Sequence, residues 1–354
     1  MNFEKKWEDF HRGKKSSSPL SLVFNLLSYL YLLIYYLRVF LYKLGFIKSR
    51  RLDARVISVG NITLGGTGKT PMVIYLSTIL KGKGENIAIL SRGYKRQDRE
   101  RIELKDRNCD WKKVGDEPYM LFGKVSDIPI FVHRDRYESG KEAQAKYHTT
   151  TFILDDGFQH WSLQRDMNVV MIDCLNPFGN YKLFPAGFLR EPLSALKRAD
   201  VFVLNQADQV TNTDEIKRVL NRYNSDAMKV ESLYHLDFIR DFSTHSLIDT
   251  EILRGKRVAA FSGIANSSSF EKTLDHLGIE IVRYFRYPDH FPYEEKDILK
   301  LEKDSLDLGT DFMLTTEKDE VRIPKIKNLK LPIYVVGIKL KITKGEKDFL
   351  KLVG

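Results

Sequence analysis

The sequence predicts an α/β fold with a mostly parallel sheet flanked by helices, followed by a second, smaller α/β domain. Three observations predict it. Short runs of β-branched residues alternate with longer helical stretches from Arg55 onward, a spacing typical of βαβ units. A glycine-rich turn follows the first of these runs. A long apolar segment precedes all of them, and it predicts an additional N-terminal membrane-associated helix.

Length and composition limit the number of domains and the kind of partner. A chain of 354 residues with 43% apolar content can bury one large core or two modest ones. We expect an N-terminal apolar helix over 1–50, a first domain over 51–227, and a second domain over 228–354 that includes the connecting segment. The more polar stretch around 212–254 is expected to connect the two domains. The net charge of +10 indicates an anionic partner, such as nucleotide phosphates, a membrane surface or nucleic acid. Cys109 and Cys174 have no metal-ligand spacing and fit a reducing compartment.

The apolar N-terminal segment, residues 16–37, contains no charged side chain. Its length would suffice for a membrane span, which needs about 20 residues. However, Ser21, Asn25 and Ser28 recur at helical spacing, so one side of its first half is polar, and several tyrosines suit a headgroup boundary. We therefore expect a helix that lies in one leaflet. A true span and a helix buried against the following domain are the alternatives.

Eight short apolar runs are predicted to form buried, mostly parallel strands. In chain order they read RVISVG, IAILS, TFILDD, NVVMID, VFVLN, RVAAFS, FMLTT and IYVVG. Polar and glycine-containing segments separate them, as expected where strands alternate with helices.

The glycine-rich turn after the first strand predicts a phosphate-binding loop. It departs from the common pattern, because Thr63 replaces the first glycine and Pro71 follows directly. Pro71 is compatible with the first turn of a helix, where N–H groups have no helical partner. Backbone N–H groups would bind phosphate, Lys69 would neutralise it, and the Thr70 hydroxyl would bind Mg²⁺. The predicted ATP-binding residues are Gly65, Gly66, Thr67, Gly68, Lys69 and Thr70.

A second nucleotide-binding element is expected at the end of another buried strand. Asp155 and Asp156 follow TFIL directly, and adjacent carboxylates repel unless a cation is nearby. We therefore predict that at least one of them supports the metal. Asp173, after a different strand, is the weaker candidate and is interpreted as structural.

The run Asn205–Asp208 favours an alternative function. It comes close to the Asn-Lys-x-Asp signature that reads guanine, which would make the protein a GTP-dependent assembly factor or switch. The accompanying Asp-x-x-Gly signature is absent, because Leu154 lies three residues before Gly157. A nucleic-acid-binding ATPase is a third class, but the sequence offers no basic, aromatic platform for it, so no nucleic-acid partner is expected.

Two proline-flanked segments carry candidate acid–base groups. Asp116 and Glu117 stand between a glycine and a proline, and Asp289 and His290 lie in a second such loop. A carboxylate hydrogen-bonded to an imidazole is a suitable general base for an alcohol that attacks phosphorus.

The combined motifs resemble those of the tetraacyldisaccharide 4'-kinases of lipid A assembly. In chain order they are GNITLGGTGKTP, SRGY, GDEP, DDGFQH, FPAGFLREP, FSGIAN, PDHFPY and TTEKD, and they extend from Gly60 to Asp319. GDEP, DDGFQH and LREP are not generic nucleotide-binding features, so the resemblance is specific. It covers nearly the whole chain, including the apolar N-terminal helix.

The resemblance implies transfer of the γ-phosphate of ATP to the 4'-hydroxyl of a tetraacylated, 1-phosphorylated glucosamine disaccharide at the cytoplasmic face of the inner membrane. It implies Asp116 as base with His290 as its partner and Glu117 as a neighbouring acid, and Mg²⁺ held on the side of Asp155 and Asp156. It also implies substrate or phosphate contacts from Arg92, Arg136, Gln159, His160, Arg190 and Glu191. Lys95, Trp161 and Phe188 depart from the family pattern, which concerns the shape of the acceptor site.

Overall fold

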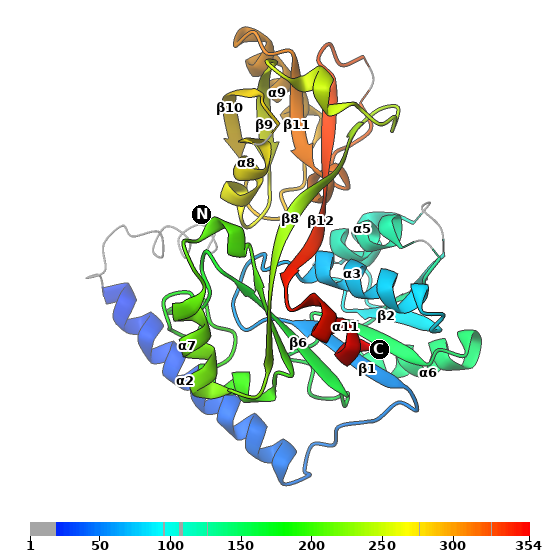
Figure 1. The fold of residues 1–354 in the computed structure, drawn as a ribbon, viewed down its shortest axis with the longest axis vertical. Coiled ribbons are helices and arrows are strands. Elements are labelled where there is room, and N and C mark those ends of the chain that lie inside the picture. The colour runs from blue at the N-terminus through cyan, green and yellow to red at the C-terminus, as the bar shows by residue number, and fades with distance from the viewer. Residues whose placement is uncertain (1–18, 95, 106–108, 126, 276, 327) are drawn as a thin grey trace. The chain divides into compact units, whose positions relative to one another are not determined.

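The computed structural model describes residues 19–94, 96–105, 109–125, 127–275, 277–326 and 328–354 (Figure 1). Lys95 therefore lies outside the described residues, as do the first residues of the apolar segment. The chain divides into two compact units, each assembled from segments distant in sequence. The first unit comprises Met1–Lys69, Asp156–Ser232 and Ile342–Gly354, and the second comprises Thr70–Asp155 and Leu233–Lys341. The expected boundaries near residues 50 and 227 stay a prediction.

The first unit contains four parallel strands in the order β8-β7-β6-β1. Their bounds are β1 Arg55–Gly60, β6 Met167–Asp173, β7 Val201–Asn205 and β8 Met228–Asp241, of which only the beginning belongs to this unit. Every residue of β6 and β7 is buried, which explains their continuous apolar sequences. The core beside them contains Phe158, Phe178 and Phe202. The helices of this unit include α2 Pro19–Lys43, α7 Asp214–Tyr223 and α11 Glu346–Val353.

The second unit contains one group of strands in the order β5-β2-β4-β3, where only β3 is antiparallel to its neighbour. The strands are β2 Ile87–Ser91, β3 Ile102–Leu104, β4 Ile130–Val132 and β5 Thr151–Asp155. The helices are α3 Lys69–Gly82, α4 Trp111–Val114, α5 Asp116–Lys124 and α6 Arg136–Tyr147. The side chain of Asp135 caps the N-terminus of α6 by accepting hydrogen bonds from the Tyr137 and Glu138 amides.

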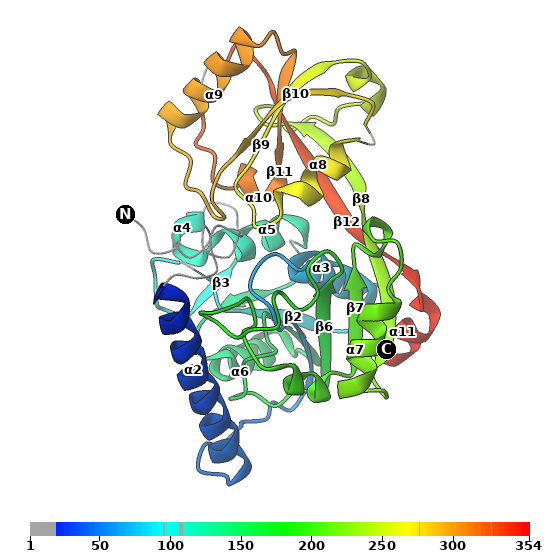
Figure 2. The same cartoon turned by 90° about the vertical axis from the view of Figure 1, so that its left-hand side faces the viewer.

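A second group of strands in this unit runs parallel in the order β10-β9-β11-β12. Its elements are α8 Ser267–Asp275, α9 Glu295–Asp307, α10 Glu317–Glu320, β9 Arg257–Ser262, β10 Glu280–Arg286, β11 Phe312–Thr316 and β12 Ile333–Lys344. Alternate β9 residues face opposite sides: Val258 and Ala260 pack with α8, and Phe261 packs with α9. Figure 2 shows these helices on either side of the strands.

The eight predicted strands are confirmed as β1, β2, β5, β6, β7, β9, β11 and β12. Among the described residues the sequence analysis missed β3, β4, β8 and β10. The expected polar connection around 212–254 contains α7 and all of the 14-residue β8. β8 was missed because most of its second half is only partly buried, so its sequence lacks a continuous apolar run.

Helix α2 contains the one described segment that is long and apolar enough to cross a membrane, Ser21–Lys43. Its polar side faces the protein rather than solvent. The Ser28 hydroxyl donates to the Leu183 carbonyl oxygen at 2.8 Å and accepts from the Ala186 amide at 2.9 Å. The Tyr31 hydroxyl donates to the Arg190 carbonyl oxygen at 2.7 Å. Ser28 and Tyr31 therefore attach α2 to the first unit.

The opposite face of α2 is apolar and exposed. Leu22, Leu26, Tyr29 and Leu33 are each at least 65% exposed, and the exposure continues to Phe46 at 77%. An exposed apolar surface of this extent is typical of a membrane or protein contact.

Candidate active site

The phosphate-binding loop of the first unit has the predicted geometry. Helix α3 begins at Lys69, so Pro71 is its third residue and lies within the first turn. Gly65 and Gly68 adopt φ angles of 107° and 95°, a region that favours glycine. Two buried asparagines hold the loop. Asn61 Nδ2 donates to the Thr63 carbonyl oxygen at 2.8 Å and to the Thr67 hydroxyl at 3.0 Å, and Asn205 Nδ2 donates to the Thr67 carbonyl oxygen at 3.2 Å.

Basic side chains gather around Asp156 in the same unit. Its Oδ1 lies 2.8 Å from Arg190 Nη1 and 3.5 Å from Lys69 Nζ. Arg190 Nη1 also lies 3.3 Å from the side-chain oxygens of Asn61 and Gln159. We call Lys69, Asp156, Gln159 and Arg190 the Arg190 cluster. It places two cations beside the phosphate-binding loop, as binding of a polyphosphate requires.

Asp155 and Thr70 belong to the second unit and are both buried. Asp155 ends β5, and its Oδ2 accepts a hydrogen bond from the Ser91 hydroxyl at 2.9 Å. Among the described residues, no group of three or more His, Cys, Asp or Glu side chains forms a metal site. Mg²⁺ typically takes only one or two protein carboxylates and fills its octahedron with water and substrate phosphates. A hydroxyl and an oriented carboxylate at a strand end therefore fit Mg²⁺.

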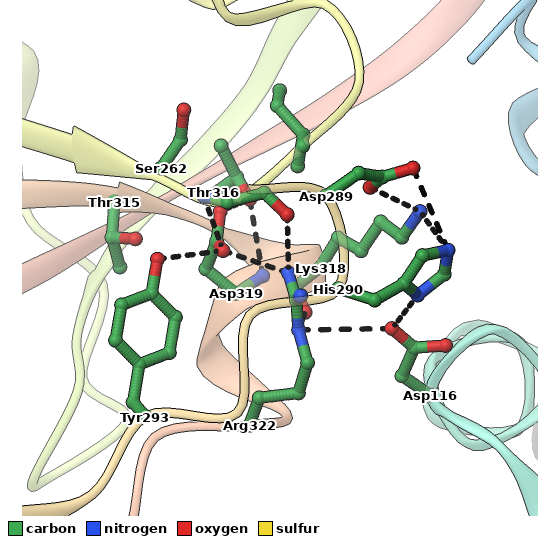
Figure 3. A network of polar contacts seen from close by, with 12 residues as sticks. Asp116, Ser262, Asp289, His290, Tyr293, Thr315, Thr316, Lys318, Asp319 and Arg322 are labelled. Atoms are coloured by element: carbon green, nitrogen blue, oxygen red, sulfur yellow. Dashed lines mark hydrogen bonds and ion pairs between the residues drawn. The ribbon is translucent and has the colours of Figure 1, made fainter. Parts of the chain in front are cut away.

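The second unit brings the predicted base and its partner together (Figure 3). His290 Nδ1 lies 2.6 Å from Asp116 Oδ2, and the two side chains are 11% and 4% exposed. Lys318 Nζ lies 3.2 Å from Glu117 Oε1. Arg322 Nε lies 3.6 Å from Asp116 Oδ2. We call Asp116, Glu117, His290, Lys318 and Arg322, with the adjacent Asp289, the Asp116 cluster.

The Asp116 cluster keeps its central carboxyl group ionised. Burial alone would raise the pKa of Asp116, but the hydrogen bond from His290 and the positive charges of Lys318 and Arg322 lower the pKa overall. A buried carboxylate that is ionised at neutral pH and hydrogen-bonded to an imidazole can accept a proton from a hydroxyl group.

The remaining predicted contact residues lie outside both clusters. Arg92 is exposed, and Arg136 is buried as the first residue of α6. His160 Nε2 lies 3.0 Å from the Ser162 hydroxyl. Glu191 is buried, accepts a hydrogen bond from Trp161 Nε1 at 3.3 Å and pairs with Arg198. Burial raises the pKa of Glu191, and the Arg198 charge offsets part of this rise.

Trp161, one of the departures from the family pattern, is part of the attachment of α2. Its ring lies 6.4 Å from the ring of Tyr35 and 5.6 Å from that of Tyr42, and the Arg198 guanidinium stacks on it at 4.3 Å. Trp161 therefore packs against the apolar helix α2 through Tyr35 and Tyr42. Phe188, another departure from the family pattern, packs its Cβ and ring against Gly179.

Comparisons with known proteins decide between the functional classes. A family model described as tetraacyldisaccharide-1-P 4'-kinase matches residues 20–353. The chain belongs to the tetraacyldisaccharide 4'-kinase family. It is 36% identical over 380 residues to the tetraacyldisaccharide 4'-kinase of Halothermothrix orenii, an alignment that covers 99% of this chain and 98% of that protein. It is 40% identical over 322 residues to the enzyme of Elusimicrobium minutum, covering 88% and 84%.

A solved structure extends the similarity to the fold. The crystal structure of the Aquifex aeolicus LpxK in complex with ATP matches with a TM-score of 0.72 and 31% identity, over 94% of this chain and 98% of that one. These comparisons confirm the resemblance and do not favour the GTP-dependent alternative. In this tetraacyldisaccharide 4'-kinase the Asn205 side chain instead contacts the phosphate-binding loop, and Asp208 is exposed.

The sequence analysis missed Lys318, Asp319 and Arg322 as site residues. TTEKD was noted as a motif of the tetraacyldisaccharide 4'-kinases without a role for its charged members. The sequence did contain a signal for two of them, which is a charged pair at the end of a buried strand. Lys318 and Asp319 lie shortly after β11, and Asp155 and Asp156 lie at the end of β5. The buried loop residue Asn61 was missed as well, because a single asparagine has no distinguishing pattern.

Proposed function

We propose that this kinase transfers the γ-phosphate of ATP to the 4'-hydroxyl of a tetraacylated glucosamine disaccharide 1-phosphate, with Asp116 as the general base. The observation that carries the assignment of the base is the 2.6 Å contact between buried Asp116 and His290. Membership of the tetraacyldisaccharide 4'-kinase family supplies the substrate class.

In the proposed reaction the phosphate-binding loop holds the donor. N–H groups of Gly65–Gly68, Lys69 and Arg190 bind the β- and γ-phosphates, and Asp156 keeps the two cations in place. Thr70, Asp155 and Asp156 would hold Mg²⁺, which when bound neutralises charge on the phosphates. Asp116 accepts the proton of the 4'-hydroxyl while the oxygen of that hydroxyl attacks the γ-phosphorus. The new O–P bond forms, the bond to the β-phosphate oxygen breaks, and ADP leaves.

The decisive experiment is incubation of the purified protein with γ-labelled ATP, Mg²⁺ and a tetraacylated glucosamine disaccharide 1-phosphate in mixed micelles. Labelled phosphate on the 4'-hydroxyl is the expected product. ATP hydrolysis without lipid phosphorylation would contradict the assignment. GTP used in preference to ATP would restore the alternative based on Asn205–Asp208.

We further propose that α2 lies in the cytoplasmic leaflet of the inner membrane, where the lipid substrate resides. The hydrogen bonds of Ser28 and Tyr31 to the first unit cover one side of the helix, which supports a helix lying flat rather than spanning. The net charge of +10 favours an anionic lipid surface.

A triple variant of α2 tests this membrane contact. Leu26, Leu30 and Leu33 are 71%, 52% and 65% exposed, so their replacement by serine leaves the folded core intact. Loss of three apolar contacts should weaken binding to vesicles of phosphatidylethanolamine and phosphatidylglycerol by roughly 10²-fold. Cosedimentation measures the binding. Serine substitution of the exposed Leu247, Ile252 and Leu299 is the matched control and should bind as the unmodified protein does. Equal binding by both variants would remove α2 as the membrane contact.

A further inference from the structure

Lys318 is a partly buried cation that contacts His290, the partner of the proposed base, and has no place in the mechanism above. Its Nζ lies 3.4 Å from His290 Nε2, 3.4 Å from Asp289 Oδ1 and 3.2 Å from Glu117 Oε1. The side chain is 19% exposed. Figure 3 shows Lys318 on the far side of the imidazole ring from Asp116, so the ring lies between an amine and a carboxylate.

These two neighbours determine which ring nitrogen carries the proton. An ammonium group can only donate hydrogen bonds and a carboxylate can only accept them. A contact from Lys318 therefore requires an unprotonated Nε2, and the contact with Asp116 requires a protonated Nδ1. We propose that Lys318 is a positioning residue that fixes the tautomer and orientation of His290, and through it the base Asp116. The catalytic consequence rests on the proposed role of Asp116.

The nearby carboxylate of Asp289 is the reason that the Lys318 amine is needed to keep Nε2 of His290 unprotonated. Its Oδ2 lies 3.6 Å from His290 Nε2, close enough to attract a proton to that nitrogen. Without Lys318, Nε2 would face the Asp289 carboxylate, an acceptor that requires a protonated nitrogen. Lys318 contacts Asp289 and Nε2 together, and so leaves Nε2 as a hydrogen-bond acceptor.

The charges that face Asp116 come from several elements. Glu117 follows Asp116 on α5, and Asp289 and His290 lie in the loop after β10. Lys318 lies on α10, and Arg322 lies just after the end of that helix. The tilted ring of Tyr94 packs on His290 with centroids 5.5 Å apart. Burial would lower the pKa of Lys318, but the carboxylates of Glu117, Asp289 and Asp116 raise it overall, so the amine stays charged.

A common buried frame holds both the amine and the imidazole. Arg322 and Asp319 are fully buried as an ion pair at 2.7 Å. Arg322 Nε donates to the Lys318 carbonyl oxygen at 3.2 Å, and its Nη2 donates to the Gly263 carbonyl oxygen at 3.0 Å. The His290 amide donates to the same Gly263 oxygen at 3.0 Å. The positions of Lys318 and His290 are therefore fixed by shared contacts.

Nitrogen NMR of the protein labelled with ¹⁵N-histidine tests the tautomer directly, with a His290→Gln variant to assign the resonance. We expect the chemical shift of an unprotonated nitrogen for Nε2 and of a protonated nitrogen for Nδ1 at neutral pH. In Lys318→Met both nitrogens should be protonated. A protonated Nε2 in the unmodified protein would overturn the proposal. This outcome does not depend on turnover, so it is distinguishable from a failure of the base assignment.

The pH dependence of kcat/KM provides the second test. In Lys318→Met the doubly protonated His290 ring replaces the lost Lys318 charge and is in direct contact with Asp116, so it lowers the pKa of Asp116, and the acid limb of the profile should shift to lower pH. We expect kcat at neutral pH to fall by roughly 10- to 10²-fold, less than on removal of the base. Lys318→Arg keeps a charged donor and should restore most of the profile. Lys325→Met, an exposed position nearby, is the matched control and should leave the profile unchanged. An unmoved acid limb in Lys318→Met would contradict the proposal.

Discussion

Asp116→Asn should lower kcat by roughly 10²- to 10⁴-fold, the range for removal of a general base. The amide preserves the shape of the side chain and can still accept the hydrogen bond from the Glu117 amide, now 2.9 Å from Asp116 Oδ1. It cannot accept the proton of the acceptor hydroxyl. Initial rates of lipid phosphorylation at saturating ATP measure the loss.

Asp127→Asn is the matched control, because the Asp127 side chain is 79% exposed and pairs with Lys81 at the surface. It should show an unchanged kcat. Thermal unfolding of both variants establishes that they are folded. Turnover of Asp116→Asn close to that of the unmodified enzyme would exclude Asp116 as the base, but it would not bear on the tautomer of His290 in the unmodified enzyme.

Lys69→Met should raise the KM for ATP and lower kcat by roughly 10²- to 10³-fold, as when one donor to transition-state charge is removed. The physical reason is the loss of a cation that lies 3.5 Å from Asp156 beside the phosphate-binding loop. Steady-state kinetics with varied ATP separates the two effects.

Lys81→Met, at the other end of α3, removes the same charge from a surface position and should have no effect on either constant. If Lys69→Met changed KM alone, Lys69 would bind ATP equally in the ground state and the transition state. Unchanged constants would remove Lys69 from the donor site.

Much of the fold could be predicted because its central strands are buried on both faces. Strands such as β2 and β7 are entirely buried, so their sequences read as short continuous apolar runs. The three-residue β4 is too short for such a pattern, and β10 has no fully buried residue. Their strand structure depends on neighbours that are distant in sequence.

The candidate site was predictable where a local motif encodes a local geometry. The phosphate-binding loop was predicted from a turn that leads into a helix, and the structure has that turn and that helix. The partnership of Asp116 and His290 joins residues 174 positions apart and came from the family resemblance rather than from spacing. Lys318 and Arg322 were missed because the significance of a buried cation depends on which carboxylates surround it, and these are supplied by separate elements.

The contacts of α2 could not be predicted for a related reason. A polar side on an apolar helix indicates two faces, but it does not reveal whether water or backbone carbonyl groups satisfy the hydroxyls. Ser28 and Tyr31 bond to the carbonyl oxygens of Leu183 and Arg190, groups whose positions depend on a loop far along the chain.

The Tyr31 hydrogen bond to Arg190 also determines how a shortened enzyme would behave. Arg190 contacts Asp156 through its side chain and α2 through its carbonyl oxygen. Enzyme produced without α2 would lose the proposed membrane contact together with a support of the proposed nucleotide site. Inhibitor potencies measured on it would then refer to a nucleotide site that lacks part of its native support. Detergent-solubilised enzyme with α2 intact is the better screening target.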